Sequence, residues 1–147
     1  MRVTVIRDVH LDAAGRHAAR RAALAPLLRQ CGDVLGVPAR ASLAMRLTGD
    51  DELRRLNRQY LDVDEPTDVL AFPGDTPGHV GDIAVSVERA LAQTDDGVAE
   101  LRLLAVHGLL HCLGHDHGDA DGAALMTAAT ERLLPDQHVP ILRPSAR

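Results

Sequence analysis

Residues 98–117 read VAELRLLAVHGLLHCLGHDH, a long apolar run that ends in a cluster of four histidines. The part through Leu113 is rich in Leu and Ala, which predicts a buried α-helix. His107 and His111 are four residues apart on that helix, so they differ by only about 40° around its axis and lie one turn apart on one face. Two imidazoles in this arrangement can bind a single metal ion.

The residues after the predicted helix supply a third histidine. Gly114 can take the left-handed conformation that ends a helix, which lets the chain turn back and bring His117 toward the other two. The resulting pattern, H-x3-H-x2-G-x2-H, has the spacing of the metzincin zinc motif. Peptidases with that motif carry a Glu directly after the first His as general base, but Gly108 stands at that position. The spacing therefore predicts a metal site that lacks the peptidase base.

The number of protein ligands separates a catalytic ion from a structural one. Three neutral imidazoles leave a coordination position open to water, as in catalytic zinc sites. A closed structural site, with a fourth ligand from His115, Asp116 or Cys112, is the alternative. Cys112 lies about 100° around the helix from His111 and is better interpreted as a small buried residue. Asp116 is suited to orient an imidazole through a hydrogen bond. Imidazole also binds Cu, Ni and Fe, so the ligands do not identify which metal is bound.

Periodicity in the rest of the chain predicts a layered α+β or α/β domain with four strands and about five helices. Alternating or β-branched stretches predict strands at 3–7, 41–47, 68–72 and 82–87. The predicted helices are 11–30 with a kink or restart at Pro26, a segment from Thr48 to about Tyr60, 88–93, 98–113, and a last one from Asp119 or Asp121 to 134. Residues 73–81, with three Gly and two Pro, predict a loop.

Composition narrows the class of protein. A chain of 147 residues suits one domain, and its 46% hydrophobic and 25% charged residues are typical of a globular protein. There is no signal-peptide pattern, no apolar run of membrane-spanning length and no set of cysteines for a disulfide framework, so we expect a cytoplasmic protein without a membrane partner. A net charge of -5 argues against a general nucleic-acid coat protein but allows a local basic groove.

The histidine segment resembles the YbeY family (UPF0054-type) of metal-dependent endoribonucleases. Two further segments carry the resemblance: Leu56–Tyr60 with Pro66–Pro73 (LNRQY and PTDVLAFP), and Gly81–Ser86 (GDIAVS). The likeness extends over about residues 1 to 135. It implies a single metal-hydrolase domain over 1–147, with a mixed four-stranded sheet and helices packed around it. We expect the last ten or so residues to form a disordered tail.

The resemblance also implies an activity and its partners. Members cleave single-stranded RNA in ribosomal RNA processing, especially at the 3′ end of the small-subunit RNA, and act in late ribosome assembly and quality control. Carried over to this chain, the ligands of one Zn²⁺ per chain are His107, His111 and His117. The implied partners are ribosomal RNA, small-subunit ribosomal proteins and an assembly GTPase.

Two positions depart from the family pattern. Family members usually carry an Arg directly after the Tyr of N-x-x-Y, where this chain has Leu61, and an aromatic residue where it has His115. Without this Arg, the chain would have to bind a phosphate in a different way from the family. Asp68 and Asp116 are the candidate proton carriers, although Asp68 also fits a turn cap and Asp116 a residue that orients an imidazole.

Arginines on two predicted helices are the candidate RNA contacts. If these helices flank the metal cleft, they form a basic funnel for a single strand; the alternative is an ordinary solvated helix face. The candidates are Arg16, Arg20, Arg54, Arg55 and Arg58.

The sequence is compatible with three alternative functions. The first is a zinc endoribonuclease of ribosomal RNA maturation. The second is a non-catalytic, zinc-stabilised ribosome-assembly factor, which Leu61 favours. The third is a metallohydrolase of another substrate, including a peptidase, which Gly108 disfavours.

Overall fold

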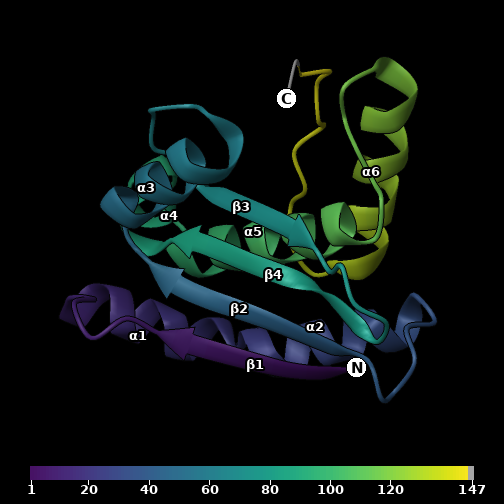
Figure 1. Cartoon of the computed structure of the whole chain (residues 1–147), viewed down its shortest axis with the longest axis horizontal. Helices are drawn as coiled ribbons and strands as arrows, with labels where there is room; N and C mark the ends of the chain where they lie inside the picture. The colour runs from purple at the N-terminus through teal and green to yellow at the C-terminus, as the bar shows by residue number, and fades with distance from the viewer. Residues whose placement is uncertain (146–147) are drawn as a thin grey trace.

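The computed structural model of the protein describes residues 1–145 and contains four strands and six helices in that range (Figure 1). The elements are β1 (Arg2–Arg7), α1 (Ala13–Ala22), α2 (Leu24–Val34), β2 (Ser42–Thr48), α3 (Asp50–Leu61), β3 (Val69–Pro73), β4 (His79–Ser86), α4 (Val87–Gln93), α5 (Gly97–Cys112) and α6 (Ala120–Leu133). No helix within these residues is both long and apolar enough to cross a lipid bilayer.

The four strands form one mixed sheet in the order β1-β2-β4-β3. β1, β2 and β4 are parallel, and β3 pairs with β4 in the antiparallel direction. On β2, Leu43, Met45 and Leu47 are almost fully buried and face the core, whereas Ser42, Ala44 and Arg46 between them are only partly buried. The mixed four-stranded α+β fold expected from the family resemblance is confirmed.

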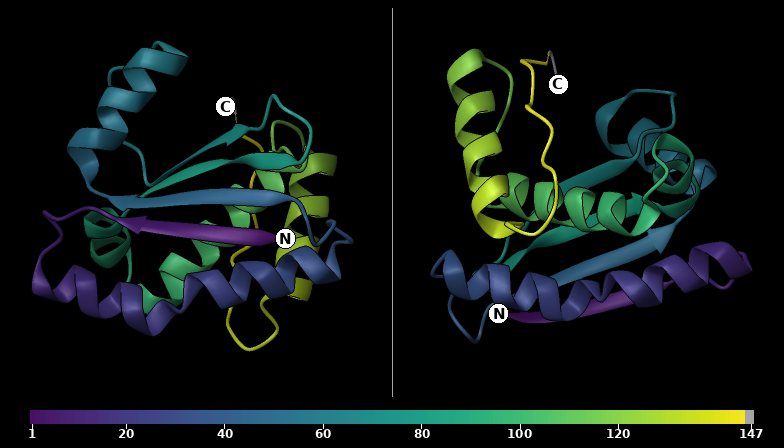
Figure 2. Two further views of the ribbon diagram at one scale, coloured as in Figure 1. Left: turned by 60° about the horizontal axis from the view of Figure 1, so that its bottom comes forward. Right: turned by 180° about the vertical axis from the view of Figure 1, so that it is seen from behind.

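Helices cover the two faces of the sheet unequally (Figure 2). α1, α2 and α5 lie on one face with the main hydrophobic core, and α5 contacts both β3 and β4. α5 is buried nearly all round because most of its side chains are apolar. α3 lies on the opposite face, where Leu53 packs on Leu70 and Ala84. The histidine-bearing helix is thus the most enclosed helix of the domain.

The first predicted helix is two helices, which is why the structure has six. The break falls at Ala23, whose φ of 48° is left-handed, and not at Pro26. Pro26 lies in the first turn of α2, where its missing N–H removes no intrahelical hydrogen bond.

The fourth strand starts inside the predicted loop. β4 begins at His79, because the backbone pairs there with Ser42 and the His79 ring lies 3.0 Å from both the Ser42 hydroxyl and an Asp82 carboxylate oxygen. The pairing and the contact with Ser42 link two strands that are far apart in the chain, so they leave no local signal in the sequence.

The C-terminal residues pack against the domain as far as Ser145, so the expected disordered tail is not found there. Val139 is buried, and the Leu142 N–H donates to the Thr127 hydroxyl on α6 at 3.0 Å. The Ser145 N–H donates to the His117 carbonyl at 2.8 Å. The segment runs beside α6 in Figure 1. The part of the expected tail at 146–147 lies outside the described residues.

Candidate metal centre

A close approach between α5 and β4 sets the position of the first two histidines. His107 and His111 lie on the C-terminal half of α5. Between them, Gly108 is buried against Ile83 of β4, and a Cβ at that glycine would lie 2.7 Å from Ile83 Cγ2. Any larger residue at 108 would therefore push the helix off the sheet. The glycine lets α5 carry its histidines at a short distance from β4.

The third histidine comes from the loop between α5 and α6. Gly114 has a φ of 99°, which an L side chain rarely adopts, and it turns the chain back at the end of α5. The His117 ring then lies beside the His111 ring, with centroids 5.3 Å apart and planes at 59°. The predicted chain reversal at this glycine is what brings the two rings together.

The three histidines line one cavity of about 520 Å³ between β3, α5 and the C-terminal segment, which we call the histidine cavity. Its other walls are largely apolar, and they include both candidate aspartates and the Leu that replaces the family Arg. The lining residues are Leu61, Thr67, Asp68, Val69, Leu70, Ala71, Pro73, Leu104, His107, His111, Asp116, His117, Leu142 and Ser145.

The ring nitrogens of these histidines differ in whether they have a hydrogen-bond partner. His111 Nδ1 lies 3.0 Å from the His115 carbonyl oxygen, which accepts its proton and leaves Nε2 with the lone pair. His107 Nε2 and His117 Nδ1 are buried and have no hydrogen-bond partner among residues 1–145. Buried polar atoms without a partner are costly, so these two nitrogens indicate that the cavity takes a ligand.

Burial also keeps two of the imidazoles, those of His107 and His111, neutral. It lowers the pKa of His107 to about 4, assisted by the nearby His111, while the negative charge of Asp68 opposes the shift. Burial and the neighbouring His117 lower the pKa of His111 as well. Neutral imidazole is the form that binds metals, so at neutral pH both rings are ready donors.

The three imidazoles are suitable ligands for a transition metal, although their present positions do not form a metal site. Three imidazoles in one cavity are the chemistry that Zn²⁺ and related ions prefer. As they stand, no three His, Cys, Asp or Glu side chains of residues 1–145 form a group that could hold an ion. Metal binding would therefore require ring movements within the cavity.

Cys112 does not complete the ligand set. A Cβ placed on Gly81 would lie 2.5 Å from the Cys112 sulfur, so this thiol faces β4 and not the cavity. Burial raises its pKa to about 12, which keeps the thiol protonated. It is a packing residue.

The two candidate aspartates occupy different parts of the histidine cavity. Asp68 immediately precedes β3, and its Oδ2 lies 3.4 Å from the Gln93 amide nitrogen, which donates to it. Asp116 lies on the exposed loop between α5 and α6. The hydrogen bond that orients His111 comes from the carbonyl of His115, whereas Asp116 contributes only its nearby negative charge to that ring.

The structure does not bring the candidate RNA-binding arginines to the cavity, because none of the five is among its lining residues. α1, with Arg16 and Arg20, lies near β1, and β1 and β3 are opposite edges of the sheet (Figure 1). On α3, Arg54 pairs with Asp64 at 2.9 Å. Arg58, on the same helix, is exposed.

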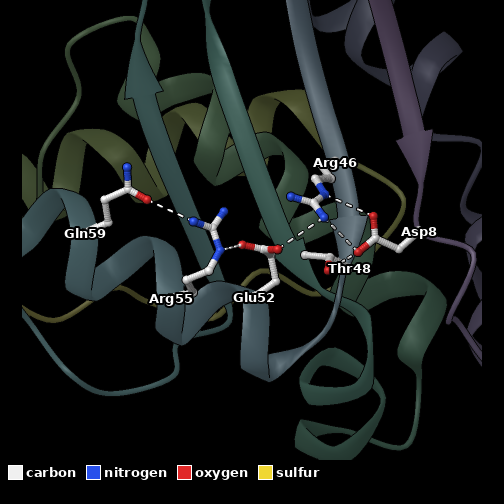
Figure 3. A network of polar contacts seen from close by, with 6 residues as sticks. All are labelled: Asp8, Arg46, Thr48, Glu52, Arg55 and Gln59. Carbon is white, nitrogen blue, oxygen red and sulfur yellow. Dashed lines mark hydrogen bonds and ion pairs between the residues drawn. The ribbon is translucent and has the colours of Figure 1, made fainter.

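Arg55 is also engaged within the protein. It pairs with Glu52 and donates to the Gln59 side chain at 2.9 Å, over the face of the sheet that α3 covers (Figure 3). The helix reaches the histidine cavity only at its last residue, Leu61.

One wall of the cavity was not predicted from the sequence. Leu142 and Ser145 line it, although both belong to the expected tail. The apolar residues Val139, Ile141 and Leu142 were the available signal, and they are too few to show a period.

The fold and the cavity define a small α+β enzyme whose candidate active groups are imidazoles and carboxylates. A profile of the endoribonuclease YbeY family matches residues 12–137, and the chain belongs to that family. It is thus a member of a family of nucleases, enzymes that hydrolyse phosphodiester bonds within RNA.

Individual relatives agree with the profile. The chain is 41% identical over 149 residues to the Endoribonuclease YbeY of Chloroflexus aggregans, an alignment that covers 90% of this chain and 92% of the relative. It is 42% identical over 127 residues to that of Azorhizobium caulinodans, covering 80% and 76%. A solution structure of a Thermotoga maritima protein is similar with a TM-score of 0.49 and 20% identity, over 91% of this chain and 90% of that one.

Proposed function

We propose that this chain is a zinc-dependent endoribonuclease specific for single-stranded RNA. It acts in the cytoplasm in ribosomal RNA processing, including 3′-end maturation of the small-subunit RNA, and in late ribosome assembly and quality control. Its partners are ribosomal RNA, small-subunit ribosomal proteins and an assembly GTPase. The observation that carries the proposal is the set of three imidazoles in one cavity: burial keeps those of His107 and His111 neutral, and His107 and His117 each present a buried nitrogen with no partner among residues 1–145.

His107, His111 and His117 would hold one Zn²⁺ per chain. A bound zinc ion supplies Lewis-acid chemistry, because it polarises a phosphoryl oxygen and activates water. The hydrogen bond from His111 Nδ1 to the His115 carbonyl would leave Nε2 of that ring available as a ligand. The apolar walls around the imidazoles strengthen electrostatic interactions with a phosphate by excluding water.

Asp68 and Asp116 are the proposed proton carriers. Both line the histidine cavity, so either carboxylate could reach water or a ribose hydroxyl there. The Gln93 amide donates to Asp68 Oδ2, which orients this carboxylate and leaves Oδ1 to accept a proton. Asp68→Asn and Asp116→Asn, assayed across pH, would identify which carboxylate titrates in the cleavage reaction.

Preference for a single strand follows from the position of the imidazoles. They lie at the side of a cavity between β3, α5 and the C-terminal segment, which a flexible strand can enter more readily than a rigid duplex. Aromatic stacking contributes little, because Phe72 and Tyr60 pack edge to face on each other, 5.3 Å apart. We therefore expect weak, salt-sensitive RNA affinity, with targeting supplied by the ribosomal partners.

The test compares metal content and cleavage in two histidine variants. His111→Ala should lose bound zinc and cleavage of a labelled single-stranded RNA, while His10→Ala, an exposed histidine outside the histidine cavity, should keep both. A duplex of the same sequence should be resistant. A His111→Ala protein that retains a full equivalent of zinc and cleaves RNA at the parent rate would refute the proposed site.

A second candidate function is favoured by one observation. Leu61 lines the histidine cavity at the position of the family Arg, and no arginine is among the lining residues. This arrangement suits a non-catalytic, zinc-stabilised assembly factor. Chelation separates the two: loss of cleavage with an unchanged circular dichroism spectrum supports catalysis, whereas unfolding on chelation without any prior cleavage supports a structural ion.

A peptidase remains the least favoured alternative. The residue after the first histidine of the motif, Gly108, faces Ile83 in the core and leaves no room there for a glutamate. Metal-dependent cleavage of a panel of unstructured peptides would contradict this argument.

A further inference from the structure

Residues 139–145, which we call the C-terminal wall, form one side of the histidine cavity. Val139 is buried at its start. The Leu142 N–H donates to the Thr127 hydroxyl of α6, and the Ser145 N–H donates to the carbonyl of His117. The wall is therefore tied to a helix at one point and to the histidine loop at another, beside α6 (Figure 2).

The histidine cavity lacks a cation of its own. The charged side chains that line it are the carboxylates Asp68 and Asp116, and the imidazoles of His107 and His111 are kept neutral by burial. An RNA phosphate that entered would meet negative charge and apolar surface. Even with a bound divalent ion, the neighbouring phosphates of the strand would have no counter-charge among the lining residues.

The C-terminal wall also carries one positive charge, on Arg143. Arg143 is exposed and lies between Leu142 and Ser145, both of which line the cavity. The backbone hydrogen bonds of those two residues anchor the chain on each side of it, and the fixed φ of Pro144 limits its freedom further. Ion pairs within residues 1–145 occupy Arg46, Arg54, Arg55 and Arg89, but not this guanidinium.

We propose that Arg143 binds a phosphate of the RNA strand that occupies the histidine cavity, so that the C-terminal wall supplies the charge that Leu61 does not. The wall lies outside residues 12–137, the part of the chain that matches the family profile. The proposal rests on the proposed nuclease function for its ligand, a single-stranded RNA.

The experiment measures binding of a fluorescent ten-nucleotide 2′-O-methyl RNA, which lacks the ribose hydroxyl, to the zinc-loaded full chain over a range of salt concentrations. Arg143→Ala should lower affinity about 5-fold at 0.1 M salt and reduce the slope of log K against log salt by about 0.7, the value for one phosphate contact on a single strand. Arg143→Lys should retain most of both. Arg132→Ala, which changes an exposed arginine of α6 away from the lining residues, is the matched control and should match the parent.

The outcomes distinguish this inference from the proposed function. An Arg143→Ala variant with the parent's affinity and salt slope overturns the inference, as does a parent without affinity for the probe. Equal losses in Arg143→Ala and Arg132→Ala also overturn it, because they indicate general charge attraction. A parent that binds the probe through Arg143 but never cleaves ordinary RNA refutes the nuclease proposal and leaves the phosphate contact intact.

Discussion

Two cavities of the domain differ in size and in how their polar groups are satisfied. The larger, about 880 Å³, lies at the carboxyl ends of β1 and β2 and is lined by several carboxylates; we call it the acidic cavity. There Arg46 lies 3.0 Å from Asp8 and 3.3 Å from Glu52, so two of these carboxylates are paired with a guanidinium (Figure 3). In the smaller histidine cavity, two buried ring nitrogens have no partner within residues 1–145.

The comparison shows that unmet hydrogen-bonding capacity, and not volume, distinguishes the proposed site from the larger cavity. Paired charges in the acidic cavity stabilise the fold without any ligand. Unpaired buried nitrogens cost folding free energy, and a protein retains them where a ligand satisfies them. The predictions below test this contrast.

The largest expected effect concerns the metal ligands. His111→Ala should lower kcat/KM for single-stranded RNA by at least about 10³-fold, because the Lewis-acid contribution of a metal ion is worth several kcal/mol. Asp8→Asn, in the acidic cavity, should leave kcat/KM unchanged. Zinc content by elemental analysis and initial cleavage rates check both. A comparable loss in the two variants would erase the distinction between the cavities.

The second effect is a pH dependence of the metal-free protein. The folded-state pKa of His107, about 4, lies below its ordinary value of 6.5, so the unfolded chain binds more protons between these values. Stability should therefore be fully present above about pH 6.5 and fall as the pH drops toward 4, by up to about 3 kcal/mol. Urea unfolding at a series of pH values measures it.

A matched variant assigns that loss to the histidine cavity. His107→Asn removes this titrating ring and should reduce the pH dependence between pH 6.5 and 4, and the remaining part comes from His111, whose pKa is also lowered by burial. Asp8 cannot produce it, since hydrogen bonding to Arg46 lowers the pKa of this carboxyl and its contribution is lost only below its ordinary value of 3.8. If the parent and His107→Asn lose stability equally, the buried imidazole is not the cause.

The third effect tests the missing cation. Leu61→Arg should raise kcat/KM by about 10- to 100-fold, because a charge-assisted hydrogen bond to a phosphate is worth about 1.5–3 kcal/mol. Metal content should not change. Arg54→Ala, Arg55→Ala and Arg58→Ala, assayed on the same RNA at fixed salt, should do little, and loss of cleavage in one of them would show that α3 already supplies the guanidinium.

The smallest effect belongs to the acidic cavity. Arg46→Met should lower the free energy of unfolding by about 1 kcal/mol at neutral pH, because its ion pairs are partly solvent-exposed. RNA cleavage should be unaffected. Thermal unfolding and a cleavage assay measure the two quantities. A stability loss above about 4 kcal/mol would show that this network matters far more than surface ion pairs normally do.

Local patterns predicted most of the fold, because strands and helices are set by short periodicities. The strands expected at 3–7, 41–47 and 68–72 agree with β1, β2 and β3 to within one residue at each end. The break at Ala23 was not predictable, since alanine has no preference for the left-handed conformation and the break depends on how α1 and α2 pack on α5. The early start of β4 depends on its neighbour β2.

The candidate site was predictable to the extent that it is local. Helix periodicity and Gly114 brought three histidines together, and the start of the third strand placed Asp68 beside them. The C-terminal wall was not predictable, because it is held by contacts between residues far apart in the chain, such as Leu142 with Thr127. The prediction that the arginines line the metal cleft was wrong for the same reason. The sequence shows which residues share a helix face, but it does not show which other element that face contacts.

The contact between Gly108 and Ile83 has an evolutionary consequence. A glutamate at 108 is the single change that would complete the peptidase motif, yet its Cβ alone would overlap a β4 side chain. A smaller residue at 83 would have to arise first, and on its own it would leave a void in the core. Each substitution is harmful alone, and only the two together would be tolerated. This epistasis separates the scaffold from peptidase chemistry, because both single mutants have lower fitness than the parent.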